Sequence, residues 1–131
     1  MIALDTNVLV RFLVEDDAAQ TKRAKAVIRK THTTGGTCYV SDIVLCELVR
    51  VLMGAYRIPR AEIVEVLQKL IISRQMTFDT TDRISRALDA FTDGRGDFAD
   101  YLLREHARDA GCQTVVTFDR VLLKEPSYTA P

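Results

Sequence analysis

The sequence lacks the features that define several protein classes. Its 131 residues contain no tryptophan, only three cysteines, and no apolar run approaching the ~20 residues that a membrane-spanning helix needs. Cys38, Cys46 and Cys112 are odd in number and widely spaced, with no Cys-x-x-Cys pair, which argues against a disulfide framework and against a zinc site. We therefore expect them to be reduced and mostly buried small residues.

The sequence also has no excess of charge. Lysine plus arginine and aspartate plus glutamate both number 18, so the formal net charge is zero. A protein that binds nucleic acid mainly through bulk charge would be more basic. One segment is nevertheless locally basic, and either a solvated helix face or a contact with a phosphate backbone would explain it. It contains Lys22, Arg23, Lys25, Arg29 and Lys30.

The N-terminal segment lacks the basic leader and long apolar core of a signal peptide, so we expect a cytoplasmic protein without a membrane association. The hydrophobic content of 47% is typical of a globular chain, and the length suits one domain spanning residues 1–131.

Short β-type runs alternate with helical patterns along the chain. Strands are expected at 2–4, 37–40, 76–78 and 114–118, with a short fifth at 128–129. Helices are expected at 7–14, 16–30, 41–54, 82–91 and 97–110, and another begins at Pro59. This alternation predicts an α/β fold, a three-layer α/β/α sandwich with a central parallel sheet of four to five strands.

The predicted helices differ in how they begin and in how apolar they are. Thr6 and Ser41 are candidates for the N-caps of the first and third helices. The third helix, SDIVLCELVRVLMG, is apolar almost all round, so we expect it to be buried on more than one side.

Acidic residues follow predicted strands at the edge where ligands bind in parallel sheets. Asp5 follows the first strand, and Asp119 follows the strand at 114–118. Glu47 lies in the middle of the apolar third helix, where a lone carboxylate is costly unless it is paired or binds a metal. Arg50, three residues later, is the simpler partner for Glu47.

A second acidic group opens the last predicted helix. Asp97 and Asp100 are three residues apart and so share one helical face. The purely structural alternatives are an N-cap role for Asp97 and an i, i+4 ion pair between Asp100 and Arg104.

The acids become informative when they are considered together. Two unit charges ~4 Å apart repel by about 4 kcal/mol at an effective dielectric constant near 20. No lysine lies among these carboxylates, so their convergence predicts a compensating cation. A purely oxygen ligand set favours Mg²⁺ or Mn²⁺ over zinc, and such a site can activate water against a phosphodiester.

Four blocks that contain these acids occur in a recognisable order: LDTNVLVR, SDIVLCELVRVL, DFADYLLREHARDAG and VVTFDR. With these blocks, the sequence resembles the PIN-domain nucleases, and especially the VapC-type toxins of bacterial toxin–antitoxin systems, over nearly its whole length.

The resemblance implies roles for individual residues. The catalytic and metal-binding set would be Asp5, Glu47, Asp100 and Asp119. Auxiliary positions would be Thr6, Asn7, Asp97 and Thr117. The candidates for holding RNA are Arg11, Lys22, Lys25 and Arg120. The implied protein is a Mg²⁺- or Mn²⁺-dependent endoribonuclease that uses metal-activated water, forms a homodimer and is silenced by a cognate VapB-like antitoxin.

Three alternatives remain open. A phosphoacceptor signalling domain also places acids at such an edge, but it would want a lysine after a late strand, where this chain has TFDR. A catalytically inactive PIN module that only binds is the second alternative. A PIN nuclease of RNA processing, without a toxin role, is the third.

Overall fold

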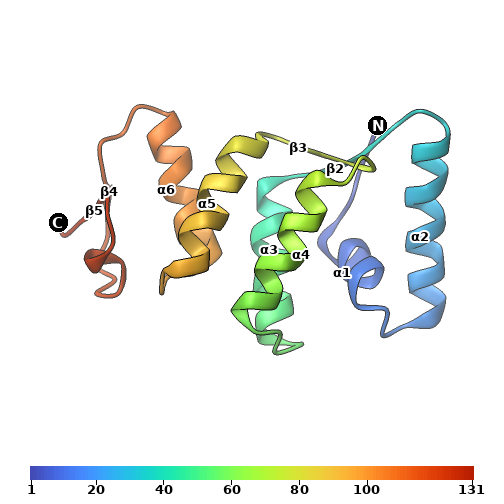
Figure 1. The fold of residues 1–131 in the computed structure, drawn as a ribbon, viewed down its shortest axis with the longest axis horizontal. Helices are drawn as coiled ribbons and strands as arrows, with labels where there is room; N and C mark the ends of the chain where they lie inside the picture. The colour runs from blue at the N-terminus through green and yellow to red at the C-terminus, as the bar shows by residue number, and fades with distance from the viewer. The chain divides into compact units, whose positions relative to one another are not determined.

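The computed structural model describes residues 1–131 throughout, and the chain divides into two units (Figure 1). Unit 1 comprises Met1–Asp79, and unit 2 comprises Thr80–Pro131. Each unit has its own helices and its own set of parallel strands, and each is described by itself.

Unit 1 is built on three parallel strands in the order β1-β2-β3. They are β1 (Ile2–Ala3), β2 (Cys38–Val40) and β3 (Met76–Phe78). In β2 and β3 the outer two residues are buried and the middle one is partly exposed, as expected from the alternation of side chains along a strand. The helices of this unit are α1 (Thr6–Val14), α2 (Ala18–Thr33), α3 (Asp42–Gly54) and α4 (Arg60–Ile72).

Side-chain caps set the starts of α1, α2 and α3 in unit 1, whereas α4 follows Pro59 without one. Ser41 caps α3 as predicted, accepting a hydrogen bond from Val44 N at 3.2 Å. The prediction that Thr6 caps the first helix is wrong, because Thr6 is the first helical residue and Asp5 is the N-cap. The Asp5 carboxylate accepts from Thr6 N at 2.8 Å, so the acid that ends the first strand also starts the first helix.

Helix α3 is less enclosed in unit 1 than its composition suggests. Leu45, Leu48 and Leu52 are buried along one face. Ile43 is 72% exposed and Glu47 is exposed on another, so the prediction of burial on more than one side is wrong for this unit. Apolar composition does not by itself determine which side chains find a partner.

Unit 2 contains two helices, a 3₁₀ turn and two parallel strands. They are α5 (Thr81–Asp93), α6 (Phe98–Asp109), β4 (Val115–Val116), η1 (Leu122–Lys124) and β5 (Tyr128–Thr129). Helices α5 and α6 lie side by side (Figure 1). Between them, the rings of Phe91 and Phe98 meet edge to face, with their centroids 5.9 Å apart. The predicted strand at 114–118 is confined to its two valines.

The loop between α5 and α6 closes over the ring of Tyr101. Gly96 N donates to the Tyr101 hydroxyl at 2.9 Å, and a Cβ at Gly94 would lie 1.9 Å from the same oxygen. Tyr101 is fully buried, so this loop needs glycine where the chain crosses its hydroxyl.

The predicted α/β organisation with parallel strands is confirmed, since every strand pairing in both units is parallel. The cysteines are free, but only Cys38 is buried, whereas Cys46 is half-buried and Cys112 is exposed, so the expectation of mostly buried cysteines is wrong. None of the helices combines the length and the apolar character required to span a bilayer.

Candidate active site

Unit 1 brings Asp5, Thr6, Asn7 and Glu47 to one shallow pocket of about 450 Å³. Thr6 Oγ1 donates to Glu47 Oε2 at 2.8 Å, which joins the first turn of α1 to α3. Thr6 is only 7% exposed while Glu47 is exposed, so this hydrogen bond is partly buried. Glu47 is therefore oriented by Thr6 rather than by Arg50, the partner that sequence spacing suggested.

Unit 2 holds Asp100 in the first turn of α6. Asp100 Oδ2 accepts from Asp97 N at 2.9 Å, and the two aspartates form a capping box at the start of this helix. The structural interpretation of Asp97 as an N-cap is thus confirmed. Burial raises the pKa of the Asp100 carboxyl, and the negative charges of Asp97 and Asp119 raise it further, against the hydrogen bond from Asp97 N.

Asp119 is fixed by the turn that follows β4. Its Oδ1 accepts from Val121 N at 2.9 Å and from Leu122 N at 3.4 Å. Its own backbone N donates to Thr117 Oγ1 at 3.0 Å. These local bonds explain why the strand ends at Val116, three residues before the acid. They leave the other carboxylate oxygen, Oδ2, for a ligand.

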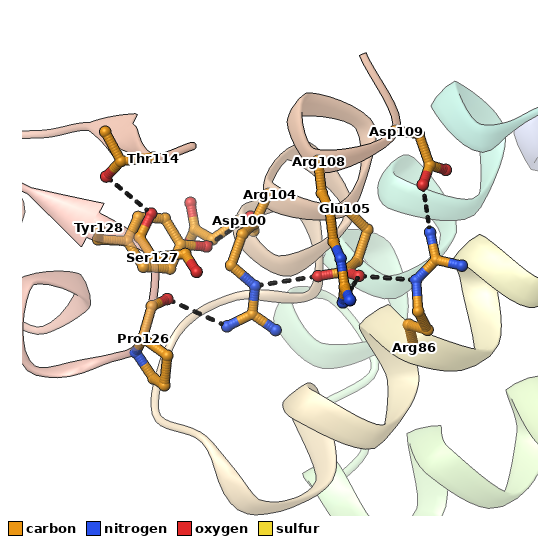
Figure 2. Close-up of polar contacts among 10 residues, drawn as sticks. All are labelled: Arg86, Asp100, Arg104, Glu105, Arg108, Asp109, Thr114, Pro126, Ser127 and Tyr128. Atoms are coloured by element: carbon orange, nitrogen blue, oxygen red, sulfur yellow. Dashed lines mark hydrogen bonds and ion pairs between the residues drawn. The ribbon is translucent and has the colours of Figure 1, made fainter. Parts of the chain in front are cut away.

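Arg104 does not pair with Asp100 as the i, i+4 spacing suggested. Its Nε donates to Glu105 Oε2 at 3.1 Å, and its guanidinium lies 5.2 Å from the ring centroid of Tyr101 and 5.9 Å from that of Tyr128. The Tyr128 hydroxyl donates to the backbone oxygen of Asp100 at 2.8 Å (Figure 2). Arg104 and Tyr128 thus tie β5 to the turn of α6 that carries Asp100.

Glu105 is the centre of this arginine network (Figure 2). It is 3% exposed and also accepts from Arg86 Nε, on α5, at 2.8 Å. Burial would raise the pKa of the Glu105 carboxyl, but the hydrogen bonds from Arg86 and Arg104 outweigh it, so the pKa lies below its ordinary value. Sequence reasoning missed Glu105. The available signal was the i, i+3 spacing of Glu105 and Arg108 on α6, which form an ion pair at 3.6 Å.

The four predicted RNA-holding residues occupy different surroundings. Arg11 lines the pocket of Asp5 and Glu47, while Lys22 and Lys25 line a second groove in unit 1 of about 480 Å³. Lys25 pairs with Glu15. Arg120 is exposed next to Asp119 in unit 2.

Within neither unit do three or more His, Cys, Asp or Glu side chains gather to hold a metal ion. Each unit instead presents two of the four predicted acids, Asp5 with Glu47 and Asp100 with Asp119. The hydrogen bonds that these four acids accept leave further lone pairs on each carboxylate for a ligand. The donors are carboxylate oxygens without sulfur or imidazole, a set that fits Mg²⁺ or Mn²⁺.

The chain matches the PIN domain family over residues 2–125, which is nearly its whole length. It belongs to this family, so the resemblance noted from the four sequence blocks is confirmed. It is also similar to a protein named VapC ribonuclease from Aquifex aeolicus (strain VF5). The two are 28% identical over 121 residues, covering 92% of this chain and 88% of the relative.

Proposed function

We propose that this protein is a metal-dependent endoribonuclease of the PIN family. The observation that carries the proposal is the pair of oriented acids in each unit, found in a chain of this family. Thr6 holds Glu47 in the pocket that Asp5 also lines in unit 1, and in unit 2 the capping box fixes Asp100 while the turn after β4 fixes Asp119. The similarity to a protein named as a ribonuclease supports RNA as the substrate.

In this proposal Asp5, Glu47, Asp100 and Asp119 hold Mg²⁺ or Mn²⁺. When bound, the ion would polarise a phosphate oxygen and lower the pKa of a water molecule. Thr6 orients the Glu47 carboxylate through its hydroxyl. Asp97 fixes the first turn of α6, which carries Asp100, and Thr117 fixes the backbone N of Asp119. Asn7 is exposed beside Asp5, where its amide can hydrogen-bond to RNA.

The basic side chains contribute to the same proposal by binding phosphates. One groove has a net positive charge, because it is lined by three basic side chains and a single acid: Lys22, Lys25, Arg29 and Glu15. Arg11 lines the pocket of Asp5, and Arg120 follows Asp119 directly in the chain. We expect each to contribute through charge rather than through base recognition.

Removal of divalent metal tests the enzymatic part of the proposal. Purified protein treated with EDTA should lose cleavage of a labelled structured RNA, because four carboxylates without a cation neither activate water nor bind a phosphate. Addition of Mg²⁺ or Mn²⁺ in excess of the chelator should restore cleavage. Cleavage that continues unchanged in EDTA would contradict metal dependence.

The biological role that we propose is that of a toxin in a toxin–antitoxin pair, acting on RNA in the cytoplasm. Expression of the chain alone should arrest bacterial growth, and co-expression of a small upstream antitoxin gene of the VapB type should relieve the arrest. Harmless expression of a protein that cleaves RNA in vitro would instead favour an RNA-processing nuclease. Loss of arrest in an Asp5→Asn variant is the control for catalysis.

We include a homodimer in this proposal. Ile43 on α3 and Ile72 on α4 of unit 1 are 72% and 80% exposed, and we expect these apolar side chains to lie at the contact between protomers. Sedimentation velocity should show a dimer, and a monomer at micromolar concentration would rule the dimer out.

A further inference from the structure

The pocket of Asp5 and Glu47 has a second end that the proposed chemistry does not use. It runs along α1 and α3, where Val10, Val51 and Ala55 line its middle and Arg11 and Tyr56 form its far end. Thr6 and Arg11 are five residues apart on α1, which is roughly 7.5 Å along the helix axis. The pocket thus passes from carboxylates through an apolar middle to an aromatic ring and a guanidinium.

Tyr56 is held firmly at this far end. Its hydroxyl donates to Asp16 Oδ2 at 2.8 Å and accepts from Arg11 Nη1 at 3.1 Å. The next residue, Arg57, adopts a left-handed conformation with φ of 54°, which turns the chain immediately after the ring. Tyr56 is nevertheless only half-buried, so its ring is anchored by the hydroxyl while part of it faces the pocket.

Arg11 is oriented by three neighbours. Its Nε donates to Gln20 Oε1 at 2.6 Å and its Nη1 to Asp16 Oδ1 at 2.9 Å, in addition to the bond to Tyr56. These bonds hold the guanidinium plane in place and leave its Nη2 group, which makes no hydrogen bond within the protein, for an external acceptor.

We infer that the Tyr56 end of this pocket is a subsite for one nucleotide of unpaired RNA. The base stacks on the Tyr56 ring, and Arg11 Nη2 donates to a phosphate oxygen. Unpaired bases are commonly held by stacking on aromatic side chains, which also tolerates different bases. The anchored ring loses little freedom when a base stacks on it, which favours binding. This inference rests on the proposed function and assigns part of the RNA-binding surface of the same pocket.

Two probes separate stacking from charge. One is a fluorescein-labelled oligouridylate of about ten nucleotides, and the other is the same ribose-phosphate chain without bases. Binding is followed by fluorescence anisotropy in an Asp100→Asn background, which prevents cleavage. Tyr56→Leu should weaken binding of oligouridylate by about tenfold, within the range measured for single base–aromatic stacks, and leave the base-free chain unaffected.

Two further variants provide matched controls. Tyr56→Phe keeps the ring and should retain most of the affinity for oligouridylate. Arg11→Gln should weaken both probes similarly and reduce the salt dependence of binding by about one phosphate contact. Equal loss of both probes in Tyr56→Leu would overturn the stacking assignment.

Photocrosslinking tests the subsite without any substitution. An oligouridylate that carries 5-iodouridine should crosslink to Tyr56 of the unaltered chain. A crosslink to Tyr39, Tyr101 or Tyr128 instead would overturn the inference, even if Tyr56→Leu fails to fold.

The remaining outcomes distinguish this inference from the proposed function. If the protein binds RNA and cleaves it with metal, but Tyr56→Leu changes neither probe, only the subsite is wrong. If Tyr56→Leu weakens binding of a protein antitoxin and leaves oligouridylate binding intact, the Tyr56 end of the pocket binds protein, and the RNA subsite is overturned. If the unaltered chain binds no RNA, the proposed function fails along with the subsite.

Discussion

Replacement of Asp100 by asparagine is expected to lower the rate of RNA cleavage by more than about 100-fold. Loss of a residue that only hydrogen-bonds to a metal ligand costs up to about 100-fold, and Asp100 is proposed to be a ligand itself. The amide keeps an oxygen that can accept from Asp97 N but loses the charge that a divalent ion requires. Cleavage of a labelled RNA at saturating Mg²⁺ measures the effect. Asp93→Asn, on an exposed residue at the end of α5, is the matched control and should retain full activity.

The same variant should fold normally. Because burial and neighbouring charges raise the pKa of Asp100, its ionised form opposes folding once the pH exceeds the unfolded-state pKa. Removal of the charge should therefore leave the melting temperature at neutral pH unchanged or slightly higher. An Asp100→Asn protein that folds and cleaves at the normal rate would show that Asp100 has no part in the chemistry.

Replacement of Glu105 by glutamine should destabilise the protein by about 3 kcal/mol at neutral pH, a cost typical of removing one partner from a buried ion pair. The amide would leave Arg86 and Arg104 without their shared counter-charge in a site where Glu105 is 3% exposed. Urea denaturation at pH 7 measures the loss. Glu65→Gln, on an exposed position of α4, should change stability by less than about 0.5 kcal/mol.

The pH dependence gives the Glu105 prediction a second test. The folded-state pKa of Glu105 is lowered, so its ionic contribution is complete above the unfolded-state pKa and is lost as the pH falls through the folded-state pKa. The stability difference between the natural chain and Glu105→Gln should therefore shrink on acidification. A difference that stays constant from neutral to acidic pH would contradict a charge-based role.

The sequence was most informative where periodicity and composition agreed. The strand at Met76–Phe78 and the fifth strand at Tyr128–Thr129 were predicted with their observed bounds, because β-type residues stand between clear helix patterns. Ser41 was predicted as a cap because it directly precedes an apolar helix. In these places the local preference and the final fold agree.

The sequence was less informative where two residues could play one role. Asp5 and Thr6 are both good capping residues, and only the structure shows that Asp5 caps α1 and frees the Thr6 hydroxyl for Glu47. The strand at 114–118 was predicted too long because Thr117 bonds locally to Asp119 N and ends the pairing.

Contacts between distant segments could not be predicted at all. The burial of Glu105 depends on Arg86, 19 residues earlier, and the position of Tyr56 depends on Asp16, 40 residues earlier. Helical spacing within one element carries no information about such pairs. The four predicted acids and the auxiliary residues Thr6, Asp97 and Thr117 were predicted from strand ends and from family resemblance. The hydrogen bonds through which these auxiliary residues orient the acids required coordinates.

In the proposed site, acids from both units bind the same divalent ion. Titration with Mn²⁺, followed by electron paramagnetic resonance, tests this for the natural chain, for Asp5→Asn and for Asp100→Asn. We predict that either single substitution weakens binding of all the bound Mn²⁺ by more than about tenfold, and that the double variant, which lacks two ligands of the same ion, binds more weakly still. Tight binding at half the original stoichiometry in each single variant, abolished only in the double variant, would show two independent sites and contradict the account.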